Sequence, residues 1–355
     1  LHAVLKKDEL WAKAGHEVAW EELELPWSLP CSSEEKAQGV PSYSLSEKEL
    51  VVSGDGFKYV FNRTDGQLTS MVVQDMELLE SPLRLNLWRA PLANELDNWN
   101  ASSARSSNWK EGYEYTVATE MYSAGIDRLT HQPLSFSVSE TTEGVHIHII
   151  DAELMGKGEK EKKDLYIEGV QNNGIINHYE YIINSEGTIE IRHVLKPEGK
   201  MPLWFPRIGL TLTVSDALDQ VKWYGRGPQE NYPDRKTGYP TGIYASTVQA
   251  MYEPYLMPQD YGLRTDVRWL QLTTDKGIGL QFKMNEWFNF NIYPYSTDNL
   301  TKAMYTYQLQ KQKGMTLNLD YATTGVGCTA RGVFGAYKAM PQEYRRTISI
   351  RPMMK

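Results

Sequence analysis

Cysteine is almost missing from this sequence of 355 residues. The two that occur, Cys31 and Cys328, lie far apart, so the sequence predicts neither a disulfide framework nor a cysteine-ligated metal site. No run approaches the roughly 20 apolar residues that span a bilayer, which predicts a soluble chain without a membrane partner. An initiator methionine and a signal-peptide pattern are also missing. We therefore expect a piece of a longer protein, with the compartment, cytoplasm or periplasm, left open.

An excess of positive charge is lacking too. The formal net charge is -8, and the lysines and arginines are scattered along the chain. Because nucleic-acid binders neutralise phosphates with a basic patch, the sequence predicts no nucleic-acid partner. The run of mixed sign at 156–164 predicts a solvated hairpin tip.

Long amphipathic helices and internal repeats are absent from the pattern, and alternation with a period of two residues dominates instead. Residues 57–62 place Phe57, Tyr59 and Phe61 on one face, and an Asp-Gly turn then leads into 68–73, which predicts a hairpin. Further predicted strands lie at 145–151, 164–170, 178–184, 188–195, 207–214, 278–284, 288–294, 315–322 and 345–352. The sequence therefore predicts an all-β sandwich of many strands.

Residues 25–49 are rich in proline, serine and charge, which is typical of a boundary between structural units. The preceding segment holds two strands at most, and two strands cannot bury a core alone. We therefore expect residues 1–30 to be the end of a truncated domain, 31–46 a linker and 47–355 the main β-unit.

A long segment at 88–113 carries Trp88, Trp99 and Trp109. Long loops without regular structure are uncommon unless they have a function, and flat aromatic faces suit the apolar faces of pyranose rings. Exposed tryptophans that bind sugar are one interpretation of this segment, and tryptophans that pack the loop onto the sandwich are the other.

A glycosidase needs two carboxylates across the glycosidic bond. Glu95 and Glu286 each follow an asparagine, as the acid does in many retaining glycosidases, but a dipeptide is weak support and surface carboxylates are the simpler interpretation. Glu230 and Asp234 form another candidate pair within residues 223–235.

The stretch at 223–235 reads WYGRGPQENYPDR, and its glycines and proline predict a stiff excursion rather than a flexible loop. We interpret its polar side chains as a structural network that satisfies backbone groups, including a charge-assisted pair to Arg235, with direct sugar contact as the alternative. The network residues are Gln229, Glu230, Asn231, Asp234 and Arg235.

Histidines on predicted strands leave another enzyme class open. His146, His178 and His193 could serve a sugar mutarotase, which uses a histidine acid and a glutamate base on a large β-sandwich. His146 and His148 share one strand face, but no third ligand follows at a motif spacing, so the sequence does not predict a zinc site.

Four blocks together resemble the C-terminal segment of the large β-galactosidases of glycoside hydrolase family two. They lie at 87–99, 223–235, 251–270 and 319–332. Residues 13–25 resemble the last strands of the immunoglobulin-like domain that precedes this segment. The resemblance implies a large antiparallel supersandwich, also seen in galactose mutarotases, after a remnant of that domain. It places the catalytic barrel and its two glutamates earlier in the parent chain, so this fragment is expected to lack catalytic residues.

The resemblance also implies which residues contact the sugar. Relatives lend a tryptophan to stack on the leaving-group sugar; here that position falls on Gly332, between Arg331 and Phe334, which weakens the expectation of lactose-type specificity. Arg331 and Phe334, with Trp99, are the predicted substrate-binding residues. Ala93 stands where the usual motif has aspartate.

The resemblance implies no cofactor for the fragment and divalent and sodium ions for the parent enzyme. The sodium ligands in some relatives match the backbone carbonyls of Met257, Pro258 and Leu300. The implied partners are the upstream barrel and a β-galactoside or related glycan, and the resemblance leaves room for a homo-oligomeric parent.

The function predicted from the sequence is that of a non-catalytic C-terminal domain, which shapes the aglycone side of the pocket and stabilises the parent. Two alternatives remain: a free-standing carbohydrate-binding module built from the 88–109 loop and the Arg331 loop, and a mutarotase-like aldose epimerase.

Overall fold

The computed structural model describes most of the chain, namely residues 1–23, 25, 39–96, 121, 124–156, 173–328 and 332–354. Several predictions fall outside these residues: the strand at 164–170, nearly all of the charged run at 156–164, and Cys31, Trp99, Trp109 and Arg331. The chain divides into two units, Leu1–Lys36 and Ala37–Lys355.

The first unit contains one antiparallel pair, β1 (His2–Val4) and β2 (Glu17–Trp20), with His2 opposite Trp20. β2 lies where the sequence predicts a strand. Both strands are exposed along nearly their whole length, as expected of a pair too small to enclose a core.

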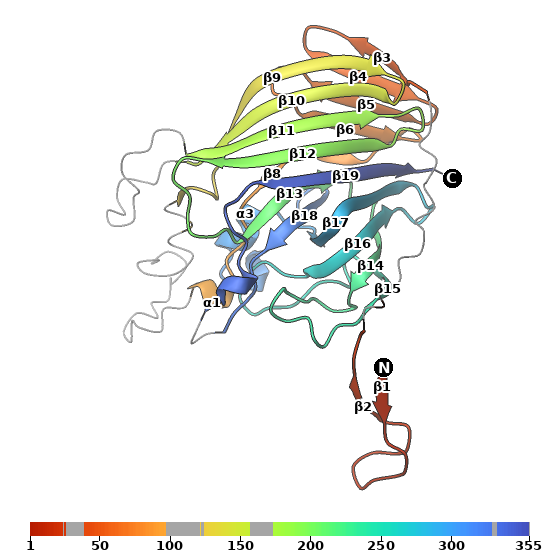
Figure 1. Cartoon of the computed structure of the whole chain (residues 1–355), viewed down its shortest axis with the longest axis vertical. Coiled ribbons are helices and arrows are strands. Elements are labelled where there is room, and N and C mark those ends of the chain that lie inside the picture. Colours follow the sequence, from red (N-terminus) through yellow and green to blue (C-terminus); the bar gives the residue numbers. More distant parts are fainter. Residues whose placement is uncertain are drawn as a thin grey trace. The chain divides into compact units, whose positions relative to one another are not determined.

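The second unit begins with a sheet of five strands, drawn in red to orange in Figure 1. The predicted hairpin at 57–73 is confirmed as β5 and β6, and Gly66 in its turn has a φ of 74°, which glycine adopts readily. The strands are β3 (Ser42–Leu45), β4 (Glu49–Gly54), β5 (Phe57–Asn62), β6 (Leu68–Val73) and β7 (Met76–Glu77). β3 thus lies among the residues that the sequence assigned to a linker.

A twelve-stranded antiparallel sheet forms the rest of the second unit, so the predicted all-β fold is confirmed. Its strands are β8 (Leu79–Asn86), β9 (Thr130–Thr141), β10 (Gly144–Leu154), β11 (Gly174–Ile183), β12 (Ile189–Glu198), β13 (Arg207–Val214), β14 (Gln220–Arg226), β15 (Thr241–Thr247), β16 (Arg264–Thr273), β17 (Gly279–Tyr293), β18 (Met315–Thr323) and β19 (Tyr344–Met353). The main path runs β15-β14-β16-β17-β19-β12-β11-β10-β9, and a branch continues from β17 through β18 and β13 to β8.

β17 is where the sheet divides. Its first part pairs with β19, from Gly279 to Met284, and its last part pairs with β18, from Asn289 to Tyr293. The sequence predicted two strands with a break between them, which is wrong. The side chains of residues 285–287 are exposed in mid-strand, and this polar, exposed stretch has the same appearance in sequence as a turn.

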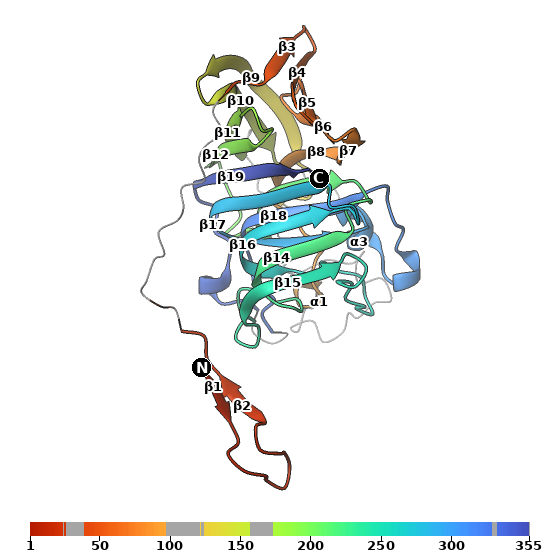
Figure 2. The ribbon, with the colours of Figure 1, turned by 90° about the vertical axis from the view of Figure 1, so that its right-hand side faces the viewer.

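The main apolar core contains residues of both sheets. Figure 2 shows the five-stranded sheet beside β9–β12 of the large sheet, with β14–β17 of the same large sheet below. Odd-numbered residues of β10, β11 and β12 face this core, so Ile147, Tyr181 and Ile191 are buried. The rings of Phe61 and Tyr181 meet edge to face at 5.2 Å across the two sheets. This contact and the shared apolar cluster make the unit a sandwich.

Helices are short in the described part of the chain: α1 (Ala93–Leu96), α3 (Thr297–Lys302) and the 3-10 turns η1 (Thr306–Gln308) and η2 (Gly335–Tyr337). Among the described residues none of the helices is long and apolar enough to cross a membrane.

Candidate functional site

The stretch at 223–235 leaves β14 and turns back toward β16. The carboxylate of Glu230 accepts hydrogen bonds from the hydroxyl of Tyr255 and, at 2.8 Å, from the N–H of Gly262. Burial raises the pKa of this carboxyl. Both oxygens therefore hold the chain at 255–262, as the network interpretation expects.

Asn231 is the innermost polar residue of this stretch, with 1% of its surface exposed. Its side-chain oxygen accepts from the N–H of Thr265 at 3.1 Å and from the Thr265 hydroxyl at 2.5 Å. Its amide nitrogen donates to the carbonyl of Gln229 at 3.1 Å. Because every one of these partners is protein, Asn231 fixes the loop against the start of β16.

Asp234 reaches a different segment, the loop that follows β18. Its two oxygens accept from the N–H groups of Val326, at 3.0 Å, and Gly327, at 2.7 Å. Arg235 donates to the carbonyl of Gly327 at 2.7 Å. The sequence interpretation expected a charge-assisted pair to Arg235, and the structure gives it this backbone oxygen as a partner instead.

The block at 87–99 holds the same loop from another direction. The guanidinium of Arg89 is fully buried and donates to the carbonyls of Thr324, at 2.6 Å, and Gly325, at 3.0 Å. It also pairs with Glu95 at 2.7 Å. The amide of Asn94 donates to the carbonyl of Val326 at 3.2 Å.

Residues 324–327 are therefore held by two sequence motifs more than a hundred positions apart, and we call them the clamped loop. The side chains of Arg89 and Asn94 donate hydrogen bonds to its carbonyl oxygens. The carboxylate of Asp234 accepts hydrogen bonds from two of its N–H groups. These contacts from two sides preorganise the backbone of residues 324–327.

The residues that follow the clamped loop include two predicted sugar contacts. Phe334 is 75% exposed, at the start of η2, which leaves its ring face available to a ligand. Arg331 and Trp99 lie outside the described residues. Gly332, at the position of the relatives' tryptophan, has a φ of 64°.

Trp88 does not extend into solvent. It is 7% exposed, and its ring N–H donates to the hydroxyl of Thr301 in α3 at 3.3 Å. Of the two interpretations of this segment, packing holds at this position, because Trp88 packs the segment onto the sandwich.

The candidate catalytic carboxylates are each engaged elsewhere. Glu95 neutralises Arg89 and also accepts from the N–H of Leu92 at 2.8 Å. Glu286 pairs with Arg346 at 2.9 Å on the exposed part of β17. With Glu230 and Asp234 holding backbone, all four have structural partners in the described residues.

The histidines of the epimerase alternative lie on two faces of one sheet. His193 points into the core, between Tyr321 at 2.7 Å and Asn177 at 3.1 Å, and burial lowers its pKa to about 3. His146 and His178 occupy even-numbered positions of β10 and β11, on the outer face. The described structure therefore does not bring the three into one site.

A buried charge cluster escaped sequence reasoning. Arg207 on β13 contacts Asp260 at 3.2 Å and Asp320 on β18 at 3.3 Å, and all three side chains are fully buried. Burial raises the pKa of Asp320 to about 6. Asn291 of β17 donates to Asp260 at 3.1 Å. The cluster anchors the blocks at 251–270 and 319–332 to the sheet.

The segments of the predicted sodium ligands come together in a small apolar cluster. Leu300, in α3, packs there with Tyr261, which follows Met257 and Pro258 by a few residues. Gln259, which follows Pro258 in the sequence, accepts a hydrogen bond from the N–H of Ala93 at 2.7 Å.

The sequence is similar to a protein family and to β-galactosidases of two bacteria. The sequence matches the family described as "Beta galactosidase small chain" over residues 53–350. It is 32% identical over 323 residues to a β-galactosidase of Priestia megaterium and 28% identical over 330 residues to one of Vibrio cholerae. These matches cover 91% and 92% of this chain but only 28% and 29% of the relatives.

Solved structures of similar shape include an epimerase homologue and an epimerase. One is the GalM/aldose epimerase homologue of C. elegans, with a TM-score of 0.42 and 9% identity, covering 87% of this chain and 98% of that one. Another is a galactose 1-epimerase of Lactobacillus acidophilus, with a TM-score of 0.38 and 10% identity, covering 88% and 97%.

Proposed function

Since the chain belongs to the beta galactosidase small chain family, matched over residues 53–350, we propose that it forms the aglycone wall of a β-galactosidase-type pocket. In this role it is a non-catalytic part of a larger glycoside hydrolase. It positions a rim, formed by the clamped loop and Phe334, beside the leaving-group sugar. It also stabilises the assembled enzyme.

The observation that carries this proposal is the clamped loop. A rim that contacts sugar must be held in a fixed position, because a misplacement of about 1 Å can lower the rate of the catalysed reaction substantially. Arg89, Asn94 and Asp234 supply that rigidity from both sides. The exposed ring of Phe334 lies seven positions beyond the clamped loop along the chain, where it can pack on a pyranose face.

The partners in this proposal are a β-galactoside or related glycan and an upstream barrel domain that supplies both catalytic glutamates. The engagement of Glu95, Glu230 and Glu286 in structural contacts supports the assignment of bond breaking to that other domain. A homo-oligomeric parent is compatible with it.

Turnover of nitrophenyl-β-galactoside by the purified 355-residue chain tests the division of labour. We expect none above the uncatalysed rate. Hydrolysis that copurifies with the chain and disappears in Glu230→Gln or Glu286→Gln would refute the non-catalytic role. Asp298→Asn, an exposed change in α3, serves as the matched control.

A sodium ion held by the carbonyls of Met257, Pro258 and Leu300 remains part of the proposal. The presence of Tyr261 and Leu300 in one buried apolar cluster supports it by bringing the two segments together. Sodium that raises the unfolding midpoint of the chain at constant ionic strength, where potassium does not, would support this site, and equal effects of the two ions would remove it.

A free-standing carbohydrate-binding module is the second candidate, and the exposure of Phe334 is the observation that favours it. Sub-millimolar binding of a glycan by the isolated chain, abolished in Phe334→Ala, would support the module over the accessory domain.

A further inference from the structure

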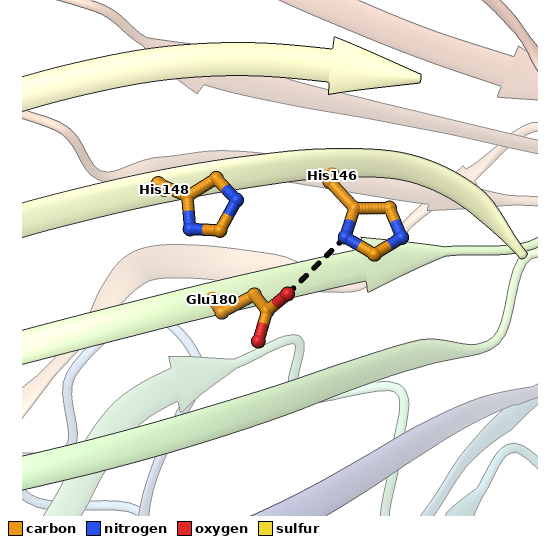
Figure 3. Close-up of side chains that lie close together, drawn as sticks. All are labelled: His146, His148 and Glu180. Carbon is orange, nitrogen blue, oxygen red and sulfur yellow. Dashed lines mark hydrogen bonds and ion pairs between the residues drawn. The ribbon is translucent and has the colours of Figure 1, made fainter. Parts of the chain in front are cut away.

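Two histidines and a glutamate lie close together on the outer face of the large sheet, and none of them belongs to the clamped loop or to the side chains that hold it. His146 and His148 lie two positions apart on β10 and so share one face. Glu180 of β11 stands directly opposite His148 in the antiparallel register. Figure 3 shows the three side chains gathered between the two strands, with the imidazole of His146 turned toward the carboxylate.

The spacing of the donor atoms suits a divalent ion. Nδ1 of His146 lies 3.2 Å from Oε1 of Glu180, close to the roughly 3.4 Å that separates two ligands of a tetrahedral zinc ion with bonds of about 2.1 Å. One donor atom from each of the three side chains lies within 4.8 Å of the others. The ring of His148 is exposed, so a small rotation closes the remaining distance without disturbing the core.

A second layer of contacts orients these donors. The hydroxyl of Thr141 lies 2.8 Å from Nε2 of His146, which leaves Nδ1 to face Glu180. Arg192 binds the other oxygen of Glu180 at 3.1 Å, so that Oε1 is directed at the histidines. Partners of this kind, which fix ring orientation and carboxylate direction, accompany metal ligands in most protein sites.

The local charge also favours a cation. Arg192 is shared by three carboxylates, those of Glu143, Glu180 and Glu190, at 4.0, 3.1 and 2.9 Å. One guanidinium therefore faces a surplus of negative charge on this face of the sheet, which a divalent ion would offset.

A comparable group nearby in sequence has a different chemistry. His131, Asp151 and Glu153 also gather their donor atoms within 4.8 Å. However, one ring nitrogen of His131 lies 2.8 Å from the Glu153 carboxylate and the other 2.7 Å from the carbonyl of Asp65. The carboxylate and the carbonyl can only accept, unlike the Thr141 hydroxyl beside His146, so the His131 ring is held as an imidazolium and keeps no lone pair for a metal.

We propose that His146, His148 and Glu180 bind a divalent metal ion of the zinc type, with solvent completing the coordination. Two imidazoles and a carboxylate are a donor set that zinc accepts, and hard cations such as magnesium are disfavoured by the nitrogen ligands. The ion joins β10 to β11 on the outer face. The proposal is independent of the role in a glycosidase.

Isothermal titration of the 355-residue chain with zinc chloride tests the site. Cys31 and Cys328 are first replaced by serine, because a thiol competes for zinc. In this background we expect one ion per chain, with binding weakened about tenfold or more by His148→Gln and by Glu180→Gln.

The matched control is His178→Gln, which removes another histidine from the same face of β11 but not from the group. It should bind zinc as the background does. Zinc should also raise the unfolding midpoint of the background and not that of His148→Gln.

The proposal is overturned if the background binds no zinc, or if His148→Gln and Glu180→Gln bind it as tightly as His178→Gln. Circular dichroism and unfolding midpoints without metal establish that each variant is folded. Because His148 is exposed and Gln replaces Glu180 with nearly equal shape, both folds should be retained.

Discussion

The carboxylate of Asp234 fills the space in which a side chain on residue 325 would begin. A Cβ atom built on Gly325 would lie 2.4 Å from Cγ of Asp234. Glycine is needed here because of this close approach and not because of an unusual φ angle. The carboxylate can reach the N–H groups of Val326 and Gly327 only while residue 325 lacks a side chain.

Replacing Gly325 by alanine should therefore destabilise the chain. The added methyl group must displace Asp234, and overpacking of this kind costs about 1–3 kcal/mol. The free energy of unfolding in urea measures the effect. Gly335→Ala is the control, since a Cβ atom there meets nothing within 4 Å, and it should change stability by no more than about 0.5 kcal/mol. Equal effects of the two substitutions would contradict the proposed packing.

A second prediction concerns the buried pair of Arg89 and Glu95. Arg89→Met removes the guanidinium and leaves the Glu95 carboxylate buried without its counter-charge, which should cost about 3–5 kcal/mol. Adding Glu95→Gln removes the stranded charge, so the double variant should recover part of the loss. Urea unfolding of the two single variants and the double variant forms the test. A double variant less stable than Arg89→Met would show that charge is not the main term.

The behaviour of Glu95 shows what sequence could and could not predict. Its place beside an asparagine made it a candidate acid, whereas its partner Arg89, six positions earlier, decides its role. The strands at 145–151 and 207–214 were predictable because alternation reflects burial on one face. The continuity of β17 was not, since pairing with β18 and β19 overrides an exposed middle.

The proposed metal group illustrates the same limit. The spacing of His146 and His148 predicts that they share one strand face, but Glu180 lies beside them only because of the register between β10 and β11. Register depends on the whole set of buried contacts between strands, and no local motif encodes it. The buried cluster of Arg207 and Asp320, which joins neighbouring strands, was hidden for the same reason.

A third prediction is a pH dependence of stability that originates at His131. The hydrogen bond to Glu153 is the main cause that raises the pKa of His131 from 6.5 to about 9. A folded pKa above the unfolded value means that the folded chain binds the proton more tightly. The stabilisation is therefore complete below about pH 6.5 and is lost as the pH rises through about 9. Unfolding in urea between pH 6 and 9.5 should show this decline.

The variant His131→Gln should lack that decline, while His178→Gln should keep it. Asp151, which neighbours the pair, does not confuse the result. Burial raises its pKa to about 6, so its titration is nearly complete before that of His131 begins. Identical pH profiles for His131→Gln and the unaltered chain would show that the ion pair with Glu153 does not store this free energy.

The last prediction concerns Phe334 and the function proposed for the rim. Phe334 is exposed and its ring is absent from the buried core, so Phe334→Ala should change the free energy of unfolding by no more than about 0.5 kcal/mol. In the assembled parent enzyme the same change should lower kcat/KM for a disaccharide by about fivefold, since stacking of an aromatic ring contributes roughly 1 kcal/mol. Nitrophenyl-β-galactoside should be affected differently, because its leaving group is not a sugar. Leu203→Ala, another exposed apolar change, controls for loss of surface area. If Phe334→Ala and Leu203→Ala alter both substrates equally, Phe334 does not contact the aglycone sugar and the rim acts through another residue.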